Sequence, residues 1–400
     1  MIKREQYMNR IRNFIGKDIV KILTGIRRCG KSVMLELIKQ ELQSQGIHEN
    51  CFISINFEDL QNAQLCNYMK LHEYISEKIK AIDGRAYIFL DEIQEVASWE
   101  KCINSLRVKF NIDIYVTGSN AKLLSGELAT VLAGRYVEIV IYPFSFSEFM
   151  EVYKETNADI SVEQCFREYI HFGGMPFLSS LNYVEESCML YLKDVYNSVV
   201  LKDIMLRNKI RDADMLQRVI IYLLANVGRT FSANSVMRYF KSENRSITTE
   251  TVVNYIKACE DAFLIYRAKR QDLMGKKILT VNEKYYTADH GLRQAIYGEN
   301  NRDIEIVLEN IVYMELLRRG YNVTIGKADT QEVDFVAEKN GEKEYYQVSY
   351  ILASEETRKR EFGALAKIND NFPKCVLSLD EFNMGYDGYK HMNIRDFLLT

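Results

Sequence analysis

Runs of apolar, β-favouring residues alternate with stretches of helical periodicity over about the first 147 residues of the chain. Short apolar runs bounded by polar residues are typical of buried strands, and apolar spacings of three and four are typical of amphipathic helices. We expect an α/β domain over residues 1–147, with a parallel sheet, helices on both faces and ligands at the carboxyl ends of the strands. The predicted strands are 19–23, 51–56, 86–90, 112–116 and 136–141.

The pattern turns helical after Phe144, and we expect a helical lid over residues 148–204. Within it, Gly173, Gly174 and Pro176 interrupt one helix and begin another. Such a helix start either meets a bound nucleotide from the lid side or is a plain turn between helices, and the sequence leaves both interpretations open.

Residues 205–295 have the pattern of a winged helix-turn-helix domain. The third helix is predicted to begin after a cap at Thr248 or Thr249. The hairpin that follows it would form the wing. The predicted elements are helices at 215–227, 232–239 and 249–262 and hairpin strands at 263–270 and 277–281.

The remaining residues, 296–400, have an α-β-β-β-α-β order with the outline of a metal-dependent, restriction-nuclease-like α+β core. Such a site needs two or three acidic ligands and a lysine that assists the attacking water. Glu309 and Asp334 supply acids, but Gln347 and Ser349 stand where another acid and the lysine would be. We therefore expect a degenerate, non-catalytic domain.

The composition of the chain indicates a general class of protein but no particular binding partner. The 400 residues carry 52 lysines and arginines against 55 aspartates and glutamates, a net charge of −3, which singles out neither nucleic acid nor membrane. No apolar run reaches the length of a membrane-spanning helix, and the first residues lack the apolar core of a signal peptide. Eight cysteines, scattered singly without metal-like spacing, predict reduced thiols and a cytoplasmic location.

Residues 25–32 read Gly-Ile-Arg-Arg-Cys-Gly-Lys-Ser and fit the phosphate-binding pattern G-x-x-x-x-G-K-[ST] between a predicted strand and a predicted helix. Glycines there let successive backbone N–H groups face one anion, Lys31 can reach the β- and γ-phosphates, and Ser32 can bind Mg²⁺. A chance match on a surface turn is the alternative. The candidate nucleotide contacts are Gly25, Ile26, Arg27, Arg28, Cys29, Gly30, Lys31, Ser32 and Val33.

The strand at 86–90 ends in two carboxylates, Asp91 and Glu92. If this strand lies parallel to and beside the first strand, Asp91 comes close to the Mg²⁺ held by Ser32. Glu92 would then act as the general base that activates the attacking water. The alternative is an acidic pair that merely ends a strand.

Two further residues complete the predicted site. The strand at 112–116 runs into Thr117-Gly118-Ser119-Asn120, and Asn120 is our choice for a side chain that reaches the γ-phosphate or orients the water, with Ser119 or Thr117 as substitutes. Arg135 precedes the strand at 136–141 and could project toward the nucleotide of a neighbouring subunit as an arginine finger. The alternative for residues 117–120 is a simple strand-to-loop turn. The alternative for Arg135 is a surface arginine in an ion pair.

The segment 205–285 has 15 lysines and arginines against 8 aspartates and glutamates, a local excess of seven positive charges. A basic module of this kind can bind duplex DNA, with the third helix in the major groove and the wing on phosphates. It can equally serve for packing and oligomerisation. The candidate DNA contacts are Thr248, Asn254 and Lys257 on the helix and Lys269, Arg270, Lys276 and Lys277 on the wing.

Together these stretches resemble the AAA+-type P-loop ATPases of bacteria and archaea that carry a C-terminal domain of unknown function with a nuclease-like fold. The resemblance spans nearly the whole chain and implies binding and hydrolysis of ATP, an assembly of subunits and a role connected with DNA. It rests on residues 24–32, 89–94, 132–136, 142–146, 173–176 and 332–335. The roles it implies are phosphate binding for Lys31 and Ser32, magnesium binding for Asp91, general base for Glu92, sensor for Asn120 and finger for Arg135.

The sequence thus predicts an ATPase that uses ATP and Mg²⁺ at the interfaces of a homo-oligomer and couples hydrolysis to DNA binding or remodelling. A nucleotide-gated switch or scaffold that acts on protein partners without DNA is the alternative. A metal-dependent nuclease is a third possibility.

Overall fold

The computed structural model describes residues 2–124, 131–132, 134–273, 275, 277–298 and 303–400. The chain divides into two compact units. Unit 1 is Met1–Pro143 with Asp261–Phe263, and unit 2 is Phe144–Glu260 with Leu264–Thr400. In the described part of the chain, no helix is both long enough and apolar enough to cross a membrane.

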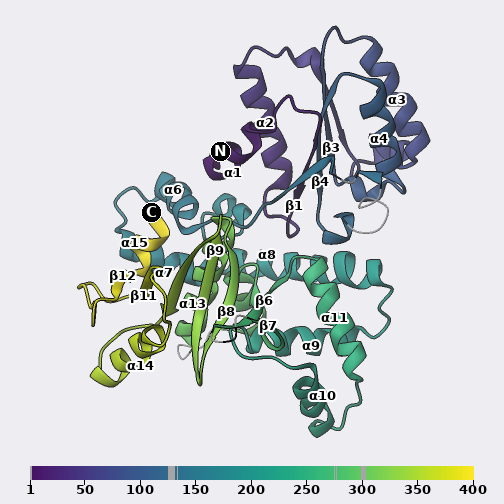
Figure 1. The fold of residues 1–400 in the computed structure, drawn as a ribbon. Helices are drawn as coiled ribbons and strands as arrows, with labels where there is room; N and C mark the ends of the chain where they lie inside the picture. Colours follow the sequence, from purple (N-terminus) through teal and green to yellow (C-terminus); the bar gives the residue numbers. More distant parts are fainter. Residues whose placement is uncertain (1, 125–130, 133, 274, 276, 299–302) are drawn as a thin grey trace. The chain divides into compact units, whose positions relative to one another are not determined.

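Unit 1 is built on a five-stranded sheet in the order β2-β3-β4-β1-β5, and every neighbouring pair is parallel (Figure 1). The five predicted strands and the parallel sheet are confirmed. Strands of this kind are buried on both faces and read as near-continuous apolar runs, which is why the sequence marks them clearly. They are β1 (Val20–Thr24), β2 (Phe52–Asn56), β3 (Ala86–Asp91), β4 (Ile112–Gly118) and β5 (Tyr136–Val140).

The strand that ends in Asp91 does not lie beside β1. The predicted role of Asp91 is conditional on β3 lying beside β1, but β4 lies between β1 and β3 and pairs with both. The apolar pattern identifies strands and does not encode their lateral order. Because all the strands are parallel, the ends of β1, β3 and β4 still meet at the same edge of the sheet.

Helices cover both faces of this sheet, with α2 on one side and α3 and α4 on the other (Figure 1). Leu71 and Ile75 of α3 and Ile103 of α4 pack with Ile22 and Ile88 in one buried cluster. The helices are α1 (Glu5–Arg12), α2 (Lys31–Ser44), α3 (Tyr68–Lys80) and α4 (Trp99–Lys109), with short 3₁₀ turns η1 (Glu49–Cys51), η2 (Leu60–Cys66), η3 (Ile93–Glu95) and η4 (Ala121–Leu124).

An ion pair lies inside unit 1, where Lys21 of β1 meets Asp113 of β4 with both side chains fully buried. The Asp113 carboxylate also accepts hydrogen bonds from the Gly16 N–H at 2.8 Å and the Tyr115 hydroxyl at 2.9 Å. The ammonium has a second acceptor in the Lys17 carbonyl oxygen at 3.3 Å. These bonds offset the cost of removing two charges from water.

Unit 2 begins with helices whose starts the sequence specifies through serine caps. Ser145 and Ser161 each form a reciprocal capping box with the residue three positions on, Glu148 and Gln164. The helices are α6 (Phe146–Thr156), α7 (Val162–Phe172), α8 (Glu185–Ser198), α9 (Ala213–Ala225), α10 (Ala233–Ser242), α11 (Thr249–Asp261) and α12 (His290–Tyr297), with the 3₁₀ turn η5 (Pro176–Leu181) and the π-helix η6 (Val199–Leu206).

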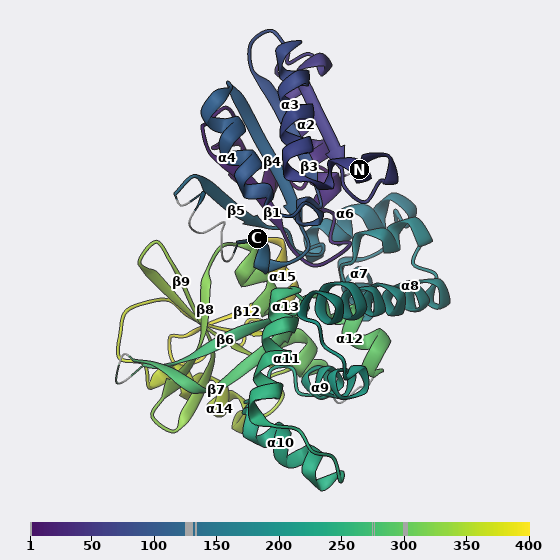
Figure 2. The same cartoon turned by 90° about the vertical axis from the view of Figure 1, so that its right-hand side faces the viewer.

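The second part of unit 2 is a mixed seven-stranded sheet in the order β12-β11-β10-β9-β8-β6-β7, whose edge toward β7 is seen in Figure 2. Three further helices, α13 (Ile304–Arg318), α14 (Glu355–Ala366) and α15 (Ile394–Leu399), accompany it. The strands are β6 (Ile265–Asp272), β7 (Lys277–Thr287), β8 (Asn322–Ala328), β9 (Gln331–Lys339), β10 (Glu342–Val348), β11 (Lys374–Ser378) and β12 (Lys390–Asn393).

The hairpin of β6 and β7 is present as expected, but it is part of a larger sheet. Strand β6 pairs in parallel with β8, with Lys269 opposite Thr324 and Arg270 opposite Ile325. The hairpin therefore extends the sheet that β8–β12 form, because β8 offers an edge that β6 can complete. A boundary drawn between 205–295 and 296–400 passes through this continuous sheet.

The buried pair in unit 1 yields a first prediction. Replacing Lys21 with methionine should lower the free energy of unfolding of unit 1 by about 3 kcal/mol, because the Asp113 carboxylate stays buried without its cation. Urea unfolding followed by fluorescence of Trp99, the chain's only tryptophan and part of this core, measures the change. The exposed Lys80 is the matched control, and its methionine variant should change stability by less than about 0.5 kcal/mol. Equal stabilities of the two variants would contradict the assignment.

Candidate functional site

The segment between β1 and α2 adopts the strained conformation that a phosphate loop requires. Gly25 has φ 141° and Gly30, at the N-cap of α2, has φ 100°, both in the region that favours glycine. A Cβ on Gly25 would lie 2.1 Å from the Ile141 carbonyl oxygen, so only glycine fits there. The predicted helix is present and starts at Lys31, and the first N–H groups of a helix have no partner within it. These groups can bind an anion.

Lys31 is buried beside this loop and folded back onto it. Its ammonium donates to the carbonyl oxygens of Gly25 and Ile26, each at 3.2 Å, and lies 3.7 Å from Glu92 Oε1. A buried ammonium needs such partners, because an isolated charge in a protein interior is very costly. The lysine is therefore held next to the place where phosphates would enter.

Asp91 ends β3 and contacts side chains from three other elements. The Thr117 hydroxyl donates to its carboxylate, Asn56 Nδ2 at the end of β2 lies 3.3 Å from its Oδ2, and the Ser32 hydroxyl at the start of α2 is near enough to influence its pKa. Burial raises the pKa of Asp91, while the hydrogen bonds from Thr117 and Ser32 act in the opposite direction. The predicted magnesium ligands, Ser32 and Asp91, thus lie near each other.

Glu92 follows in a left-handed backbone conformation, with φ 56°, and its Oε1 lies 3.7 Å from the Lys31 ammonium. Its N–H donates to Thr117 Oγ1 at 2.8 Å, and its carboxylate accepts hydrogen bonds from Gln94 Nε2 and the Ser119 hydroxyl. Burial alone would raise the pKa of Glu92, but Lys31 and these donors outweigh it and lower the pKa below its usual value. The carboxylate is held ionised, as a general base must be.

The end of β4 and the loop after it complete the site. Thr117, Ser119 and Asn120 are all buried. Thr117 bridges Asp91 and Glu92 and Ser119 contacts Glu92, so the two residues named as substitutes for Asn120 touch the carboxylates directly. Asn120 lies in the same loop, and its role toward the γ-phosphate stays a prediction.

The other predicted nucleotide contacts differ in exposure. Arg27 is buried and donates to Glu58 Oε1 at 2.9 Å, whereas Arg28 is exposed with φ 68°. Cys29 is fully buried, and burial raises the pKa of its thiol, which makes it a poor nucleophile. Ile26 is buried and Val33 is exposed.

One residue of the site was missed by the sequence analysis. The guanidinium of Arg4 is buried and donates to the Cys29 carbonyl oxygen at 3.1 Å and to the Tyr142 carbonyl oxygen at 2.8 Å. It thereby ties the phosphate loop to the segment after β5. An arginine far from any motif gives no sequence signal for such a role.

Arg135 lies at the other edge of the sheet. Its carbonyl oxygen accepts a hydrogen bond from the N–H of Val20, the first residue of β1, while the phosphate loop follows the last residue of that strand. Its exposed side chain contacts Asn104 Oδ1 at 3.3 Å. An arginine in this position cannot serve its own phosphate loop, and the finger role requires a neighbouring subunit.

The donor set fits a magnesium triphosphate. Ser32 and Asp91 offer a hydroxyl and a carboxylate oxygen side by side, and Mg²⁺ prefers oxygen ligands of this kind with the remaining positions filled by phosphates and water. Only glycine fits at position 25, so the loop backbone can approach phosphates closely.

The residues predicted to contact DNA are not all available. On α11, Asn254 and Lys257 are exposed, and Thr248 Oγ1 accepts the N–H of Thr251 and caps the helix. Lys269 is also exposed, whereas Arg270 pairs with Glu332 at 3.0 Å, and its role as a phosphate contact stays a prediction.

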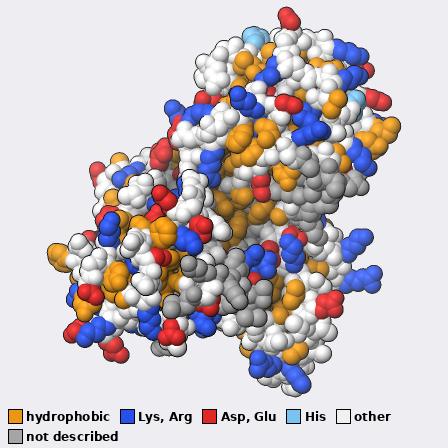
Figure 3. All heavy atoms as spheres, in the orientation of Figure 1, with side chains coloured by type: hydrophobic (Ala, Val, Ile, Leu, Met, Phe, Trp, Pro, Cys, Tyr) orange, Lys and Arg blue, Asp and Glu red, His pale blue; other side chains and the backbone are white. Residues whose placement is uncertain are grey.

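Two predicted DNA contacts cannot be placed: Lys276 lies outside the described residues, and for Lys277 the structure describes only the backbone. On the face drawn in Figure 3, basic side chains are interspersed with acidic ones, so the positive excess is not gathered there into one patch.

The acidic residues of the expected nuclease core surround a lysine. Lys284 of β7 lies 3.0 Å from Glu309, 2.8 Å from Glu332 and 4.0 Å from Asp334. The expectation that positive charge is missing there is therefore wrong, because a neighbouring strand supplies it. Gln347 Oε1 accepts the Asp334 N–H at 3.2 Å. Among the described residues, no group of three or more acidic, histidine or cysteine side chains is arranged to hold a metal ion.

The glycines before Pro176 pack against backbone within unit 2. The Gly174 N–H donates to Asp289 Oδ2 at 2.7 Å, and its carbonyl oxygen accepts the Phe144 N–H at 2.6 Å. A Cβ on Gly173 would lie 2.3 Å from Asp289 Oδ1. These contacts favour a structural turn over a helix start that binds nucleotide.

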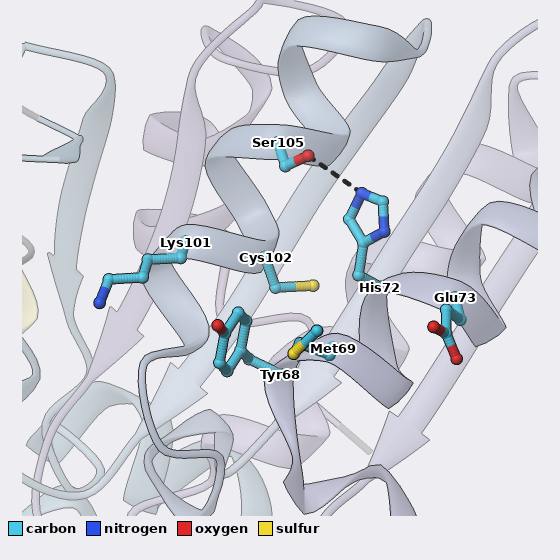
Figure 4. Close-up of a pocket in the computed structure, with 7 residues that line it drawn as sticks. All are labelled: Tyr68, Met69, His72, Glu73, Lys101, Cys102 and Ser105. Atoms are coloured by element: carbon cyan, nitrogen blue, oxygen red, sulfur yellow. Dashed lines mark hydrogen bonds between the residues drawn. The ribbon is translucent and has the colours of Figure 1, made fainter.

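A pocket of about 250 Å³ lies at the surface between α3 and α4 (Figure 4). His72 Nε2 and Ser105 Oγ meet there at 3.0 Å. None of its lining residues belongs to the phosphate loop or to the ends of β3 and β4, so it is separate from the nucleotide site. The lining residues are Tyr68, Met69, His72, Glu73, Lys101, Cys102 and Ser105.

Comparisons with known proteins agree with this geometry. A family model described as an AAA domain matches residues 17–150, and a model of a domain of unknown function matches residues 163–303. An uncharacterised protein of Haemophilus influenzae is 38% identical over 400 residues, which are 100% of this chain and 99% of that protein. An uncharacterised protein of Methanocaldococcus jannaschii is 29% identical over 395 residues, 94% of this chain and 85% of that protein.

Solved structures resemble the chain only distantly. The structure of Aeropyrum pernix Orc1 in complex with DNA is 12% identical to this chain, with a TM-score of 0.32. The match covers 73% of this chain and 91% of the Orc1 chain. The structure of Aquifex aeolicus DnaA bound to AMPPCP is 14% identical, with a TM-score of 0.34. This match covers 64% of this chain and 86% of the DnaA chain. Scores of this size carry no argument about this chain, and the sequence matches carry the assignment.

Proposed function

The chain belongs to the AAA+-type P-loop ATPases that carry a further domain of unknown function, and on this basis we propose that it binds Mg·ATP at residues 25–33 and hydrolyses it. The observation that supports this most directly is the meeting of two distant motifs. Ser32 lies close enough to Asp91 to influence the pKa of its carboxyl, and Lys31 lies 3.7 Å from Glu92, beside the glycine loop.

The residues divide the chemistry as follows. Lys31 leaves the Gly25 and Ile26 carbonyl oxygens and binds phosphate oxygens, which compete better for an ammonium than neutral carbonyls do. Ser32 and Asp91 would hold Mg²⁺, which neutralises charge on the triphosphate. Glu92 accepts a proton from the water that attacks the γ-phosphorus, the bond from phosphorus to the bridging oxygen breaks, and ADP and phosphate leave.

We further propose that hydrolysis is coupled to DNA in an assembly of subunits. The exposed position of Arg135, away from its own phosphate loop, supports a role at the nucleotide of a neighbour, where it would stabilise charge in the transition state. The exposed Asn254 and Lys257 of α11 and the basic excess of its segment support contact with duplex DNA.

Hydrolysis is tested with two variants of the buried site. Lys31→Ala should abolish measurable binding of Mg·ATP, because the phosphates lose their main cation. Glu92→Gln should keep binding and lower kcat by about 100-fold or more, the range for loss of a general base. Calorimetry and phosphate release measure the two effects. Binding that survives in Lys31→Ala, or turnover that survives in Glu92→Gln, would contradict the proposal.

DNA coupling is tested by charge reversal on α11. Lys257→Glu should weaken binding to duplex DNA several-fold and reduce the dependence of log K on log salt by about one unit, as expected for a lost phosphate contact. Fluorescence anisotropy measures both quantities, and Lys80→Glu, an exposed lysine on α3, is the matched control. If duplex, single-stranded and branched DNA all fail to bind the wild-type chain at low salt, the DNA part of the proposal is wrong and a protein partner takes its place.

A further inference from the structure

Gln94 is held against the carboxylate proposed as the general base. It lies in η3, directly after the left-handed residue Glu92, so the chain turns back and its side-chain amide reaches the preceding acid. Its Nε2 donates to Glu92 Oε2, the oxygen that does not face Lys31. Hydrogen bonds to an ionised carboxylate are among the strong ones in proteins.

The other end of this amide shows what fixes its orientation. Gln94 Oε1 is buried and has no hydrogen-bond partner among the described residues. A buried acceptor without a partner costs about 1–3 kcal/mol. Another contact of the Gln94 side chain must therefore offset this cost and keep the amide in this orientation. Flipping the amide would set its oxygen against a Glu92 oxygen, and the bond to Glu92 is therefore the contact that orients it.

Gly118 gives the amide its room. A Cβ built on Gly118 would lie 2.8 Å from Gln94 Oε1 and 2.8 Å from Leu123 Cδ2, closer than side-chain atoms approach one another. Both atoms are ends of flexible side chains, so a methyl group there would displace the amide without breaking the strand. Glycine at the end of β4 thus permits the contact between Gln94 and Glu92.

We propose that Gln94 is a positioning residue that selects which oxygen of Glu92 acts as the base, an inference that rests on the proposed ATPase function. With Oε2 held by the amide, Oε1 faces the phosphate loop, 3.7 Å from Lys31. When Lys31 turns to the phosphates, Oε1 loses that cation and can take the proton of the attacking water. Gly118 contributes indirectly, through the space it leaves.

The test compares Gln94→Ala, Gln94→Glu and Gly118→Ala with wild type, measuring kcat, KM and the dissociation constant of AMPPCP. Gln94→Ala should lower kcat about tenfold, as for one charge-assisted hydrogen bond, and change the AMPPCP dissociation constant less than twofold. Gln94→Glu keeps the shape but loses the donor, and its kcat should fall at least as far.

Gly118→Ala provides the second arm. It should lower kcat in the wild-type background and have little further effect in Gln94→Ala, since both changes remove the same contact. The exposed Gln43 on α2 is the matched control, and Gln43→Glu should keep wild-type kcat. Trp99 fluorescence verifies that each variant is folded.

The outcomes separate the two proposals. Wild-type kcat in Gln94→Glu, additive losses in the double variant, or a loss confined to nucleotide affinity would overturn the role of Gln94 while leaving the ATPase intact. A wild-type chain that binds nucleotide without hydrolysing it would overturn both.

Discussion

The buried ammonium of Lys31 is the charge around which the rest of the site is arranged. It cannot stay in the interior without partners, so the glycine loop turns two carbonyl oxygens toward it and Glu92 comes within 3.7 Å. Thr117 then fixes Asp91 and Glu92 from a third strand. The arrangement satisfies the lysine without a ligand, and phosphate oxygens would replace the same partners. Binding and catalysis are thereby linked, because the step that engages Lys31 also releases a Glu92 oxygen.

Much of unit 1 can be predicted from sequence, because buried parallel strands and a glycine-rich turn leave strong local signals. The five strands and the start of α2 at Lys31 follow from them. The order of the strands does not, since β4 enters between β1 and β3 without any mark in the apolar pattern. For the same reason, the sequence does not predict that Thr117 contacts both Asp91 and Glu92, because these contacts require β4 to lie beside β3.

Unit 2 shows where local patterns mislead. Basic residues on a predicted hairpin resemble a DNA-binding wing, yet Arg270 pairs with Glu332 and Lys284 with Glu309 and Glu332, partners far along the chain. A charge count cannot distinguish a solvated lysine from one that neutralises a buried acid. The helical caps at Ser145 and Ser161, by contrast, follow from their own neighbours.

A crystal structure of the chain with Mg·AMPPCP tests the central claim most directly. The account predicts that the Lys31 ammonium moves from the loop carbonyl oxygens and Glu92 to the β- and γ-phosphates, while Ser32 and Asp91 face the metal. A nucleotide bound elsewhere, or a Lys31 that keeps its contact with Glu92 beside bound phosphates, would contradict it.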